Sequence, residues 1–313
     1  MGKDLQQWEQ RIGRRVRLRD LHILSVVVAC GSMGKAARQL AMSQPSVSES
    51  VSNLEFAMGV PLLDRSPRGV EPTLYGSALL RRGDAVFDEL MQGVREIEFL
   101  SDPQQGEVRV ATGDTGAAGL LAPAIDRLAT RYPQIVVRVS QSSAEPLGYP
   151  ELRERRVDVV LARISRTFAH DELDIDWLFD DPPRVAAGLR SPWARRRKVD
   201  IAELVHERWA LTSDQVIHEF VLEAFRARGL PPPREQVTAS SMLLRSRLLD
   251  TGRYLTVLPA SVLAHNARAW GIKTLPVQLD MQPMCLTLLT LRRRTLSPVA
   301  ALLIEQVRSL CRL

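Results

Sequence analysis

The sequence predicts an α/β protein with a small helical N-terminal domain, a long connecting helix and a larger two-lobed domain. Up to about residue 100 the apolar residues recur at helical spacing, and the stretch from Thr73 to Leu100 contains no proline. From Gly106 onward short β-rich runs alternate with helical runs, which is typical of parallel sheets covered by helices. We therefore place the domains at residues 1–76, 77–105 and 106–313.

The first two predicted helices lie close together in the sequence. Apolar residues recur at helical spacing from Leu18 to Val28, and this pattern ends at Gly31, a residue suited to the position after a helix. Ser32 can cap a second, short helix, in which the small residues Ala36 and Ala37 allow close crossing of a neighbour. This spacing indicates a helix-turn-helix.

A third helix and a wing are predicted to follow. Ser43 can cap this helix and Pro45 suits its first turn. Its inward residues are Val47, Val51 and Leu54. Two short extended runs between Gly59 and Thr73 then flank a polar, basic tip, so the pattern as a whole predicts a winged helix-turn-helix.

Positive charge is concentrated in this part of the chain. Up to Arg82 there are twelve basic residues against seven acidic ones, which accounts for five of the six net positive charges of the chain. A basic end on a nearly neutral body favours a polyanionic partner, although charge alone does not distinguish DNA, RNA and acidic lipid.

One long motif resembles the LysR-type transcriptional regulators, and the order of domains agrees over the whole chain. The resemblance implies a winged helix-turn-helix, a linker helix and a periplasmic-binding-protein-like sensor with two lobes. It rests on Gly31-Ser32-Met33, Ala36-Ala37-Arg38-Gln39-Leu40, Ser43-Gln44-Pro45-Ser46-Val47-Ser48, Leu54-Glu55, Gly59-Val60-Pro61-Leu62-Leu63-Asp64-Arg65 and Thr73-Leu74-Tyr75-Gly76.

The resemblance also implies which residues contact double-stranded DNA. On the third helix these are Ser43, Gln44, Pro45, Ser46 and Ser48, and on the wing Arg65 and Arg68. Gln44 is our candidate for a base contact, because its amide can form two hydrogen bonds with adenine. For each serine the alternative is a helix cap or a solvated surface.

The third helix departs from the family pattern on its exposed face. It carries Glu49 where related proteins commonly have a basic residue, so phosphate contacts are expected to shift to other cations, and Glu49 could accept from cytosine. The further candidates for DNA contact are Ser32, Lys35, Arg38 and the cluster Arg14, Arg15, Arg17 and Arg19.

The linker helix carries an apolar stripe, which we expect to pair with a second copy of the chain. The stripe consists of Leu79, Val86, Leu90, Val94 and Ile97. A homodimer would let two winged helices read two half-sites. Packing against its own chain is the alternative, and the sequence leaves open whether dimers pair into a tetramer. A polar hinge is expected at residues 101–106.

Residues 106–313 are predicted to form a sensor whose two lobes enclose an effector. We place lobe I at about 106–164 and 268–313, and lobe II at about 165–267. The segment Thr112-Gly113-Asp114-Thr115 joins a strand to a helix and is the first candidate contact. The others are Ser142, Ser143, Arg163 and Thr212, for each of which a cap or turn is the alternative. Asp114 disfavours an anionic effector unless it faces away.

The sequence predicts no enzyme, cofactor or metal site. The glycines at 113, 116 and 119 do not have the dinucleotide-binding spacing, and the five histidines and three cysteines lie apart. We expect a cytoplasmic protein without a membrane span, with RNA polymerase as a further candidate partner. The competing interpretations are an architectural, non-specific DNA-binding protein, and an α/β small-molecule-binding protein or enzyme with a fused helical domain.

Overall fold

The structure is a computed structural model, which describes residues 15–67, 69–142, 148–277, 279 and 284–311. The chain divides into two compact units, with the boundary after Met91. None of the described helices combines the length and the apolar content that crossing a membrane requires.

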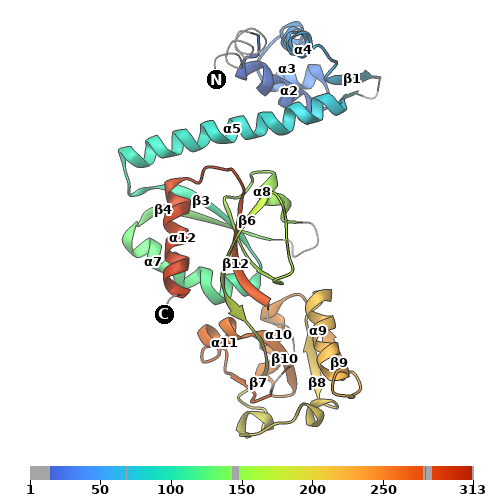
Figure 1. Ribbon diagram of the computed structural model, residues 1–313, viewed down its shortest axis with the longest axis vertical. Helices are drawn as coiled ribbons and strands as arrows, with labels where there is room; N and C mark the ends of the chain where they lie inside the picture. The colour runs from blue at the N-terminus through green and yellow to red at the C-terminus, as the bar shows by residue number, and fades with distance from the viewer. Residues whose placement is uncertain (1–14, 68, 143–147, 278, 280–283, 312–313) are drawn as a thin grey trace. The chain divides into compact units, whose positions relative to one another are not determined.

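The described part of the N-terminal unit is a winged helix-turn-helix followed by the start of a long helix (Figure 1). The wing is an antiparallel pair in which Leu63 lies opposite Pro72. The elements are α2 (Leu18–Cys30), α3 (Met33–Gln39), α4 (Gln44–Met58), β1 (Leu63–Ser66), β2 (Gly69–Pro72) and α5 (Leu74–Ser101).

Local signals set the helix ends largely as predicted. Gly31 adopts a left-handed conformation with φ of 62° and donates its N–H to Val28. The Ser43 hydroxyl caps α4 by accepting from the Ser46 N–H at 3.3 Å. Ser32 precedes α3, but its side chain accepts no capping hydrogen bond, so the expected side-chain cap is wrong in this detail.

The core of this unit consists of the residues predicted to face inward. Val47, Val51 and Leu54 of α4 are fully buried, and so is Ala36 of α3. The absence of a larger side chain at Ala36 allows the two helices to approach closely, as the helix-turn-helix requires.

Backbone contacts fix the wing to the helices. The Glu55 carboxylate of α4 accepts from the N–H groups of Leu62 and Leu63, at 2.8 and 3.2 Å. The Val70 N–H donates to the Gly31 carbonyl at 3.0 Å. Gly69, with φ of 135°, lies so close that a Cβ atom there would be 2.8 Å from the same carbonyl oxygen. The wing is therefore held at both ends by the helices it follows.

The linker helix α5 is only partly covered within its own chain. Leu79 packs against the core of the N-terminal unit. Further along the predicted stripe, Val86, Leu90, Val94 and Ile97 are 42%, 49%, 46% and 66% exposed. Four apolar side chains on one helix face are therefore left substantially exposed in the described part of the chain.

Two five-stranded sheets form the described part of the second unit. In the first, β3 pairs in parallel with β4 and β5, whereas β12 is antiparallel to both β5 and β6. The first sheet has the order β4 (Gln134–Gln141), β3 (Gln105–Thr112), β5 (Val159–Ile164), β12 (Met284–Leu291) and β6 (Leu173–Asp181). The second has the order β11 (Ile272–Thr274), β7 (Pro183–Gly188), β10 (Tyr254–Pro259), β8 (Arg208–Leu211) and β9 (Glu235–Thr238).

Helices cover both sheets. A helix runs from α6 (Asp114–Gly116) through a π-helical turn (Ala117–Leu121) into α7 (Ala122–Arg131), and it packs with α12 (Pro298–Cys311) on the first sheet. The remaining helices are α8 (Pro150–Arg153), α9 (Gln215–Arg226), α10 (Met242–Asp250) and α11 (Ala260–Asn266), with 3₁₀ turns at Pro192–Arg195 and Ile201–Leu204.

The strand pairing corrects the expected division between the lobes. Residues 165–267 were assigned to lobe II, but β6 belongs to the first sheet, where it pairs with β12. Residues 268–313 were assigned to lobe I, but β11 belongs to the second sheet, where it pairs with β7. Both pairings join segments that lie far apart in the chain, so local sequence patterns do not reveal them.

We expect Glu55→Ala to destabilise the N-terminal unit by about 2 kcal/mol, because it leaves two partly buried N–H groups without their charged acceptor. The control is Glu49→Ala on the exposed face of the same helix, with an expected effect within about 0.5 kcal/mol. Denaturant unfolding followed by circular dichroism measures both. Equal stabilities of the two variants would contradict the role given to Glu55.

Candidate nucleic-acid interface and ligand cavity

The start of α4 and the adjoining surface of α3 hold most of the predicted nucleic-acid contacts. Lys35 and Arg38 are exposed on α3. On α4, Gln44, Pro45 and Glu49 are exposed. The predicted serines are less available: Ser32, Ser46 and Ser48 are half-buried, and Ser43 is exposed.

Gln44 lies beside the first turn of α3. Its Oε1 atom is 3.3 Å from the position that a Cβ atom would occupy at Gly34, so a side chain at that glycine would crowd the amide. In contrast, the hydroxyls of Ser43 and Ser46 lie 2.8 Å apart and bond to each other. The two serines therefore shape the start of α4, while the Gln44 amide has no hydrogen bond to another described residue.

The wing presents Arg65 next to α4. Its guanidinium lies 3.6 Å from the Glu55 carboxylate, and its side chain remains 46% exposed. An exposed ion pair of this kind contributes little free energy, so a phosphate can replace the carboxylate at small cost. Arg68, the other predicted wing contact, lies outside the described residues.

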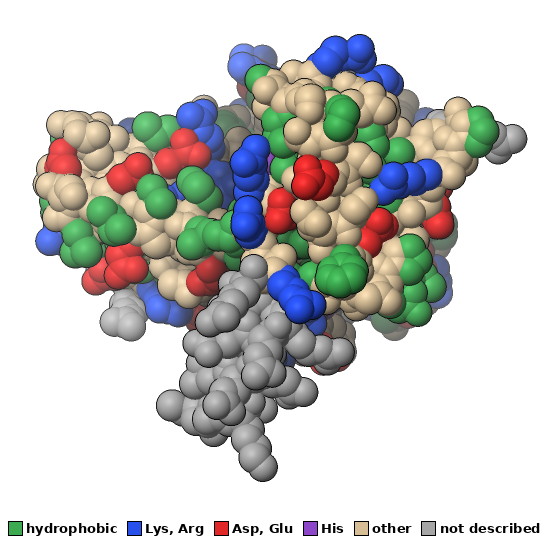
Figure 2. Space-filling model, turned by 90° about the horizontal axis from the view of Figure 1, so that it is seen from above, with side chains coloured by type: hydrophobic (Ala, Val, Ile, Leu, Met, Phe, Trp, Pro, Cys, Tyr) green, Lys and Arg blue, Asp and Glu red, His purple; other side chains and the backbone are tan. Residues whose placement is uncertain are grey.

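Further cations lie before and along the first helix. Arg15, Arg17 and Arg19 are exposed, whereas Arg14 lies outside the described residues. The Arg15 guanidinium stacks over the exposed ring of Phe56, 5.8 Å from its centroid. Figure 2 shows Lys and Arg side chains gathered in groups on the face it presents, with apolar side chains exposed beside them.

The second unit contains a cavity of about 650 Å³ between its two sheets. The carboxyl ends of β3 and β5 open onto it from the first sheet, and those of β8 and β10 from the second. Its wall combines hydroxyl groups with apolar side chains such as Tyr149, Phe220 and Met284. A cavity of this size and composition suits a small organic molecule.

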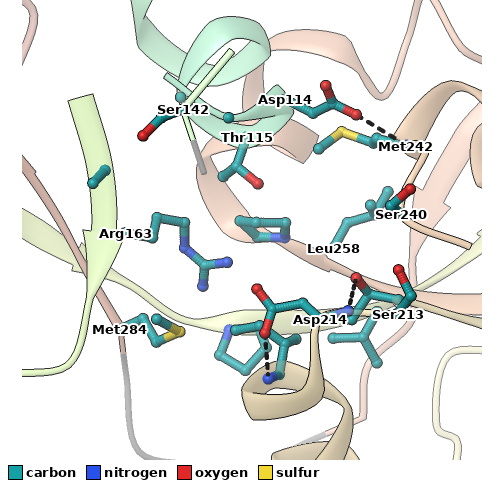
Figure 3. A pocket seen from close by; sticks show the side chains of 18 of the residues that line it. Asp114, Thr115, Ser142, Arg163, Ser213, Asp214, Ser240, Met242, Leu258 and Met284 are labelled. Atoms are coloured by element: carbon teal, nitrogen blue, oxygen red, sulfur yellow. Dashed lines mark hydrogen bonds between the residues drawn. The ribbon is translucent and has the colours of Figure 1, made fainter. Parts of the chain in front are cut away.

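Arg163 projects into the cavity from β5. Its side chain is 11% exposed, and Figure 3 shows the guanidinium extended toward Asp214. Nη2 donates to the Asp181 carbonyl at 2.9 Å, and Nε lies 3.4 Å from the Asp181 carboxylate without a hydrogen bond. Burial lowers the pKa of Arg163, and the charges of Asp181 and Asp214 oppose this shift.

Arg245 is a second buried cation in the cavity wall, on α10. The residue is 6% exposed, and its Nη1 donates to the Val257 carbonyl at 3.2 Å. Its Nε atom is buried without a partner, and no carboxylate of the described residues lies within ion-pair distance. Burial lowers the pKa of Arg245, with partial compensation by the charge of Asp114. A guanidinium buried in this way is costly until an anion joins it.

Asp114 connects the two sides of the cavity. Its carboxylate, on the first lobe, accepts from the Met242 N–H at the start of α10 in the second lobe, at 3.1 Å (Figure 3). The carboxylate thus satisfies a free N–H of a helix end instead of facing the cavity unpaired. The sequence left open whether Asp114 faces away from a ligand; this contact commits one of its oxygens to the protein.

Most of the residues predicted to contact an effector line the cavity. Gly113, Asp114, Thr115, Ser142, Arg163 and Thr212 line it. Thr112 does not line it: its hydroxyl is buried against the Leu161 carbonyl at 2.7 Å, because the end of β3 packs on β5. The Ser142 hydroxyl bonds to Glu151 at 2.5 Å. Ser143 lies outside the described residues.

Sequence reasoning missed Arg245, Asp214 and Tyr149, which also line the cavity. Arg245 lies on a helix that the sequence pattern did not predict. Asp214 caps α9 by accepting from the Ile217 N–H at 3.2 Å. A run of polar residues after a β-strand is the signal that could have indicated Asp214, which lies three residues beyond the end of β8.

Two family profiles together match most of the chain. Residues 18–77 match the "Bacterial regulatory helix-turn-helix protein, lysR family", and residues 101–312 match the "LysR substrate binding domain". The HTH-type transcriptional regulator GbpR of Azospirillum brasilense is 25% identical over 305 residues, which cover 94% of this chain and 86% of that protein. CrgA of Neisseria meningitidis is 37% identical over 142 residues, which cover 45% of this chain and 46% of that regulator.

Solved structures share the fold. A full-length OxyR variant from Pseudomonas aeruginosa matches with a TM-score of 0.61 at 21% identity, covering 94% of this chain and 95% of that one. Full-length CbnR in complex with its target DNA matches with a TM-score of 0.54 at 21% identity, covering 95% of this chain and all of that one. From its two domains, the chain belongs to the LysR family of transcriptional regulators, with a DNA-binding helix-turn-helix and an effector-binding domain.

Proposed function

We propose that this regulator reads DNA with the start of α4, binds as a homodimer through α5, and responds to an effector that carries an anionic group. The observation that carries the effector assignment is Arg245, a buried guanidinium at the cavity without a carboxylate partner in the described residues. We place its action in the cytoplasm, with RNA polymerase as a partner. The proposal assigns no catalytic step to the chain, in keeping with relatives that are named as regulators.

The DNA assignment rests on which side chains are free to bond. Gln44 is exposed at the first turn of α4 with an unengaged amide, whereas Ser43 and Ser46 bond to each other. An amide in the major groove can pair with adenine. Arg65 has only a weak ion pair to give up, and its place on the wing suits a phosphate.

The dimer assignment rests on the stripe of α5. Val86, Leu90, Val94 and Ile97 follow helical spacing and remain exposed, a pattern that a second copy of the same helix covers symmetrically. Two copies would present two winged helices to a site with two half-sites. Pairing of dimers into a tetramer would use other surfaces.

The effector assignment rests on charge. Arg163 already shares Asp181, but Arg245 has only carbonyl and hydroxyl acceptors nearby. Asp114 does not form an ion pair with Arg245, and one of its oxygens accepts from the Met242 N–H. The Arg245 guanidinium is therefore open to an anionic group of the effector. Guanidinium groups form short, paired hydrogen bonds with carboxylates and phosphates. The apolar residues of the wall, such as Phe220, would hold the remainder of the effector.

The same helix gives the effector a route to the rest of the protein. Arg245 lies one turn after Met242, whose N–H bonds to Asp114 of the other lobe. An anion at Arg245 would therefore act on the helix that joins the lobes. It can shift the arrangement of the lobes only as far as it binds one arrangement more tightly than another.

Gln44→Ala should reduce the preference of the full-length protein for its own upstream DNA over scrambled DNA, because it removes the amide that pairs with the base. Arg65→Ala should instead weaken binding to both DNAs and flatten the salt dependence by about one unit of slope. Asn53→Ala, exposed later on α4, is the control. Fluorescence anisotropy at several salt concentrations separates these effects. Preference that survives Gln44→Ala would reject the base contact, and equal binding to both DNAs by the unaltered protein would favour a non-specific DNA-binding protein.

Leu90→Glu should convert the dimer to a monomer, because it places a charge in the middle of the proposed apolar interface. Arg81→Glu, exposed on the same helix away from the stripe, should leave the mass unchanged. Sedimentation equilibrium measures the mass of both variants. An unchanged mass for Leu90→Glu would reject the linker helix as the dimer contact.

Arg245→Met should raise the stability of the ligand-free protein by about 1 kcal/mol, because it removes a buried cation that lacks an anion. The same variant should no longer show the increase in melting temperature that carboxylic acids give to the unaltered protein. Arg247→Met, on the exposed side of α10, should keep that increase.

A panel of small aliphatic and aromatic acids, each paired with its amide, serves as the probe in a thermal-shift assay. Stabilisation by the amides as strongly as by the acids would contradict an anionic effector. So would a full response of Arg245→Met to the acids.

A further inference from the structure

The second sheet of the sensor ends in a row of arginines on the side away from the cavity. Arg190 follows β7, Arg253 precedes β10, Arg208 begins β8 and Arg234 precedes β9. These four strands are neighbours in the sheet, in that order. Strand pairing puts Tyr254 opposite Arg208, and the backbone N–H after Arg208 donates to the Arg234 carbonyl at 3.0 Å. The four arginines therefore lie side by side at the same end of the sheet.

All four side chains of this row, which we call the arginine row, are exposed. Within the described residues, none of them forms an ion pair with a carboxylate. Neighbouring strands lie about 4.8 Å apart, so the row extends over roughly 14 Å. Three cations from the segment between β7 and β8 are also exposed and likewise without an ion pair there: Arg195, Arg197 and Lys198. In Figure 1 this segment lies at the end of the second sheet farthest from β12.

The acidic residues at this end offset the row only in part. Glu203 is paired with Arg196 at 3.0 Å and also completes a capping box with Asp200. Glu207 and Asp250 lie close to the row in the sequence, but neither forms an ion pair with it in the described part of the chain. The arginine row and its three neighbouring cations therefore carry an excess of positive charge.

Several exposed arginines elsewhere in the second unit differ from the row, because they have partners on their own chain. Arg138 pairs with Glu107, and Arg292 pairs with Asp174. The cations of the row differ from these arginines because they have no ion-pair partner within the described residues.

We propose that the arginine row binds the phosphate backbone of double-stranded DNA outside the segment that the winged helix reads. A row of guanidinium groups at regular spacing fits a regular line of phosphates, and such contacts depend on charge and not on base sequence. The proposal presupposes that the protein binds DNA through α4, but it adds a separate, sequence-independent contact by the sensor. That contact would lengthen the DNA held by each protomer.

The test compares two full-length variants in which the same amount of charge is removed. In the first, Arg190, Arg208 and Arg253 are replaced by glutamine, and in the second Arg138, Arg156 and Arg292, which are exposed but paired with Glu107, Glu154 and Asp174. Both should fold, because all six side chains are on the surface. Binding to a long duplex of random sequence is measured by anisotropy over a range of salt concentrations.

The arginine-row variant should bind the long duplex more weakly and with a smaller salt slope, reduced by about 0.9 for each phosphate that is no longer neutralised. The control variant should keep the slope of the unaltered protein. A short duplex that only the winged helix can cover should bind both variants equally.

If the arginine-row variant matches the control on the long duplex, the proposal is wrong, and the row would then fit an acidic protein surface better. Failure of the underlying DNA assignment has a different signature. In that case Arg65→Ala also leaves the affinity and the salt slope unchanged.

Discussion

The geometry of the sensor depends on the buried carboxylate of Asp181, which is fully inaccessible to solvent at the crossover from β6 to β7. It accepts from the N–H and the hydroxyl of Ser261 at 2.8 and 2.7 Å, at the start of α11, and it lies 3.4 Å from Nε of Arg163. A buried carboxylate is tolerable only with such partners. One residue therefore fixes where the chain passes between the sheets, where α11 begins and where Arg163 points.

In the N-terminal unit the corresponding constraint is made by hydrogen bonds to the backbone of the wing and of the residues just before it. Glu55 and the Gly31 carbonyl hold the wing, and Gly69 is required by the close approach of that carbonyl. These contacts give Gly31 and Glu55, two residues of the sequence motif, a structural role. The hydroxyls of Ser43 and Ser46 bond to each other at the start of α4. Under the proposed function, specificity depends on the Gln44 amide more heavily than the motif alone suggests.

The sequence was informative where structure is determined locally. Gly31 and Ser43 mark helix ends, and Val47, Val51 and Leu54 mark a buried face, because caps and helical periodicity act over a few residues. It failed where partners are distant. The pairing of β6 with β12 and of β11 with β7 decides the lobes, yet the same apolar runs would suit other neighbours. Thr112 was misjudged for a related reason, since only the packing of β3 against β5 shows that its hydroxyl is engaged.

Arg245 is the clearest example of a cavity residue that the periodicity of the sequence does not indicate. Its helix, α10, leaves Leu243 and Leu244 exposed at 66% and 47% while burying an arginine, which is the reverse of the usual pattern and explains why periodicity gave no signal. Such an arrangement opposes stability, because a buried cation without an anion is costly. Where local rules are broken at a cavity, a functional reason is the economical explanation. Under the proposed function, the cation that weakens the empty sensor is the same group that makes an anionic effector stabilising. Occupancy of the cavity would then be coupled to the position of α10 and, through Asp114, to the other lobe.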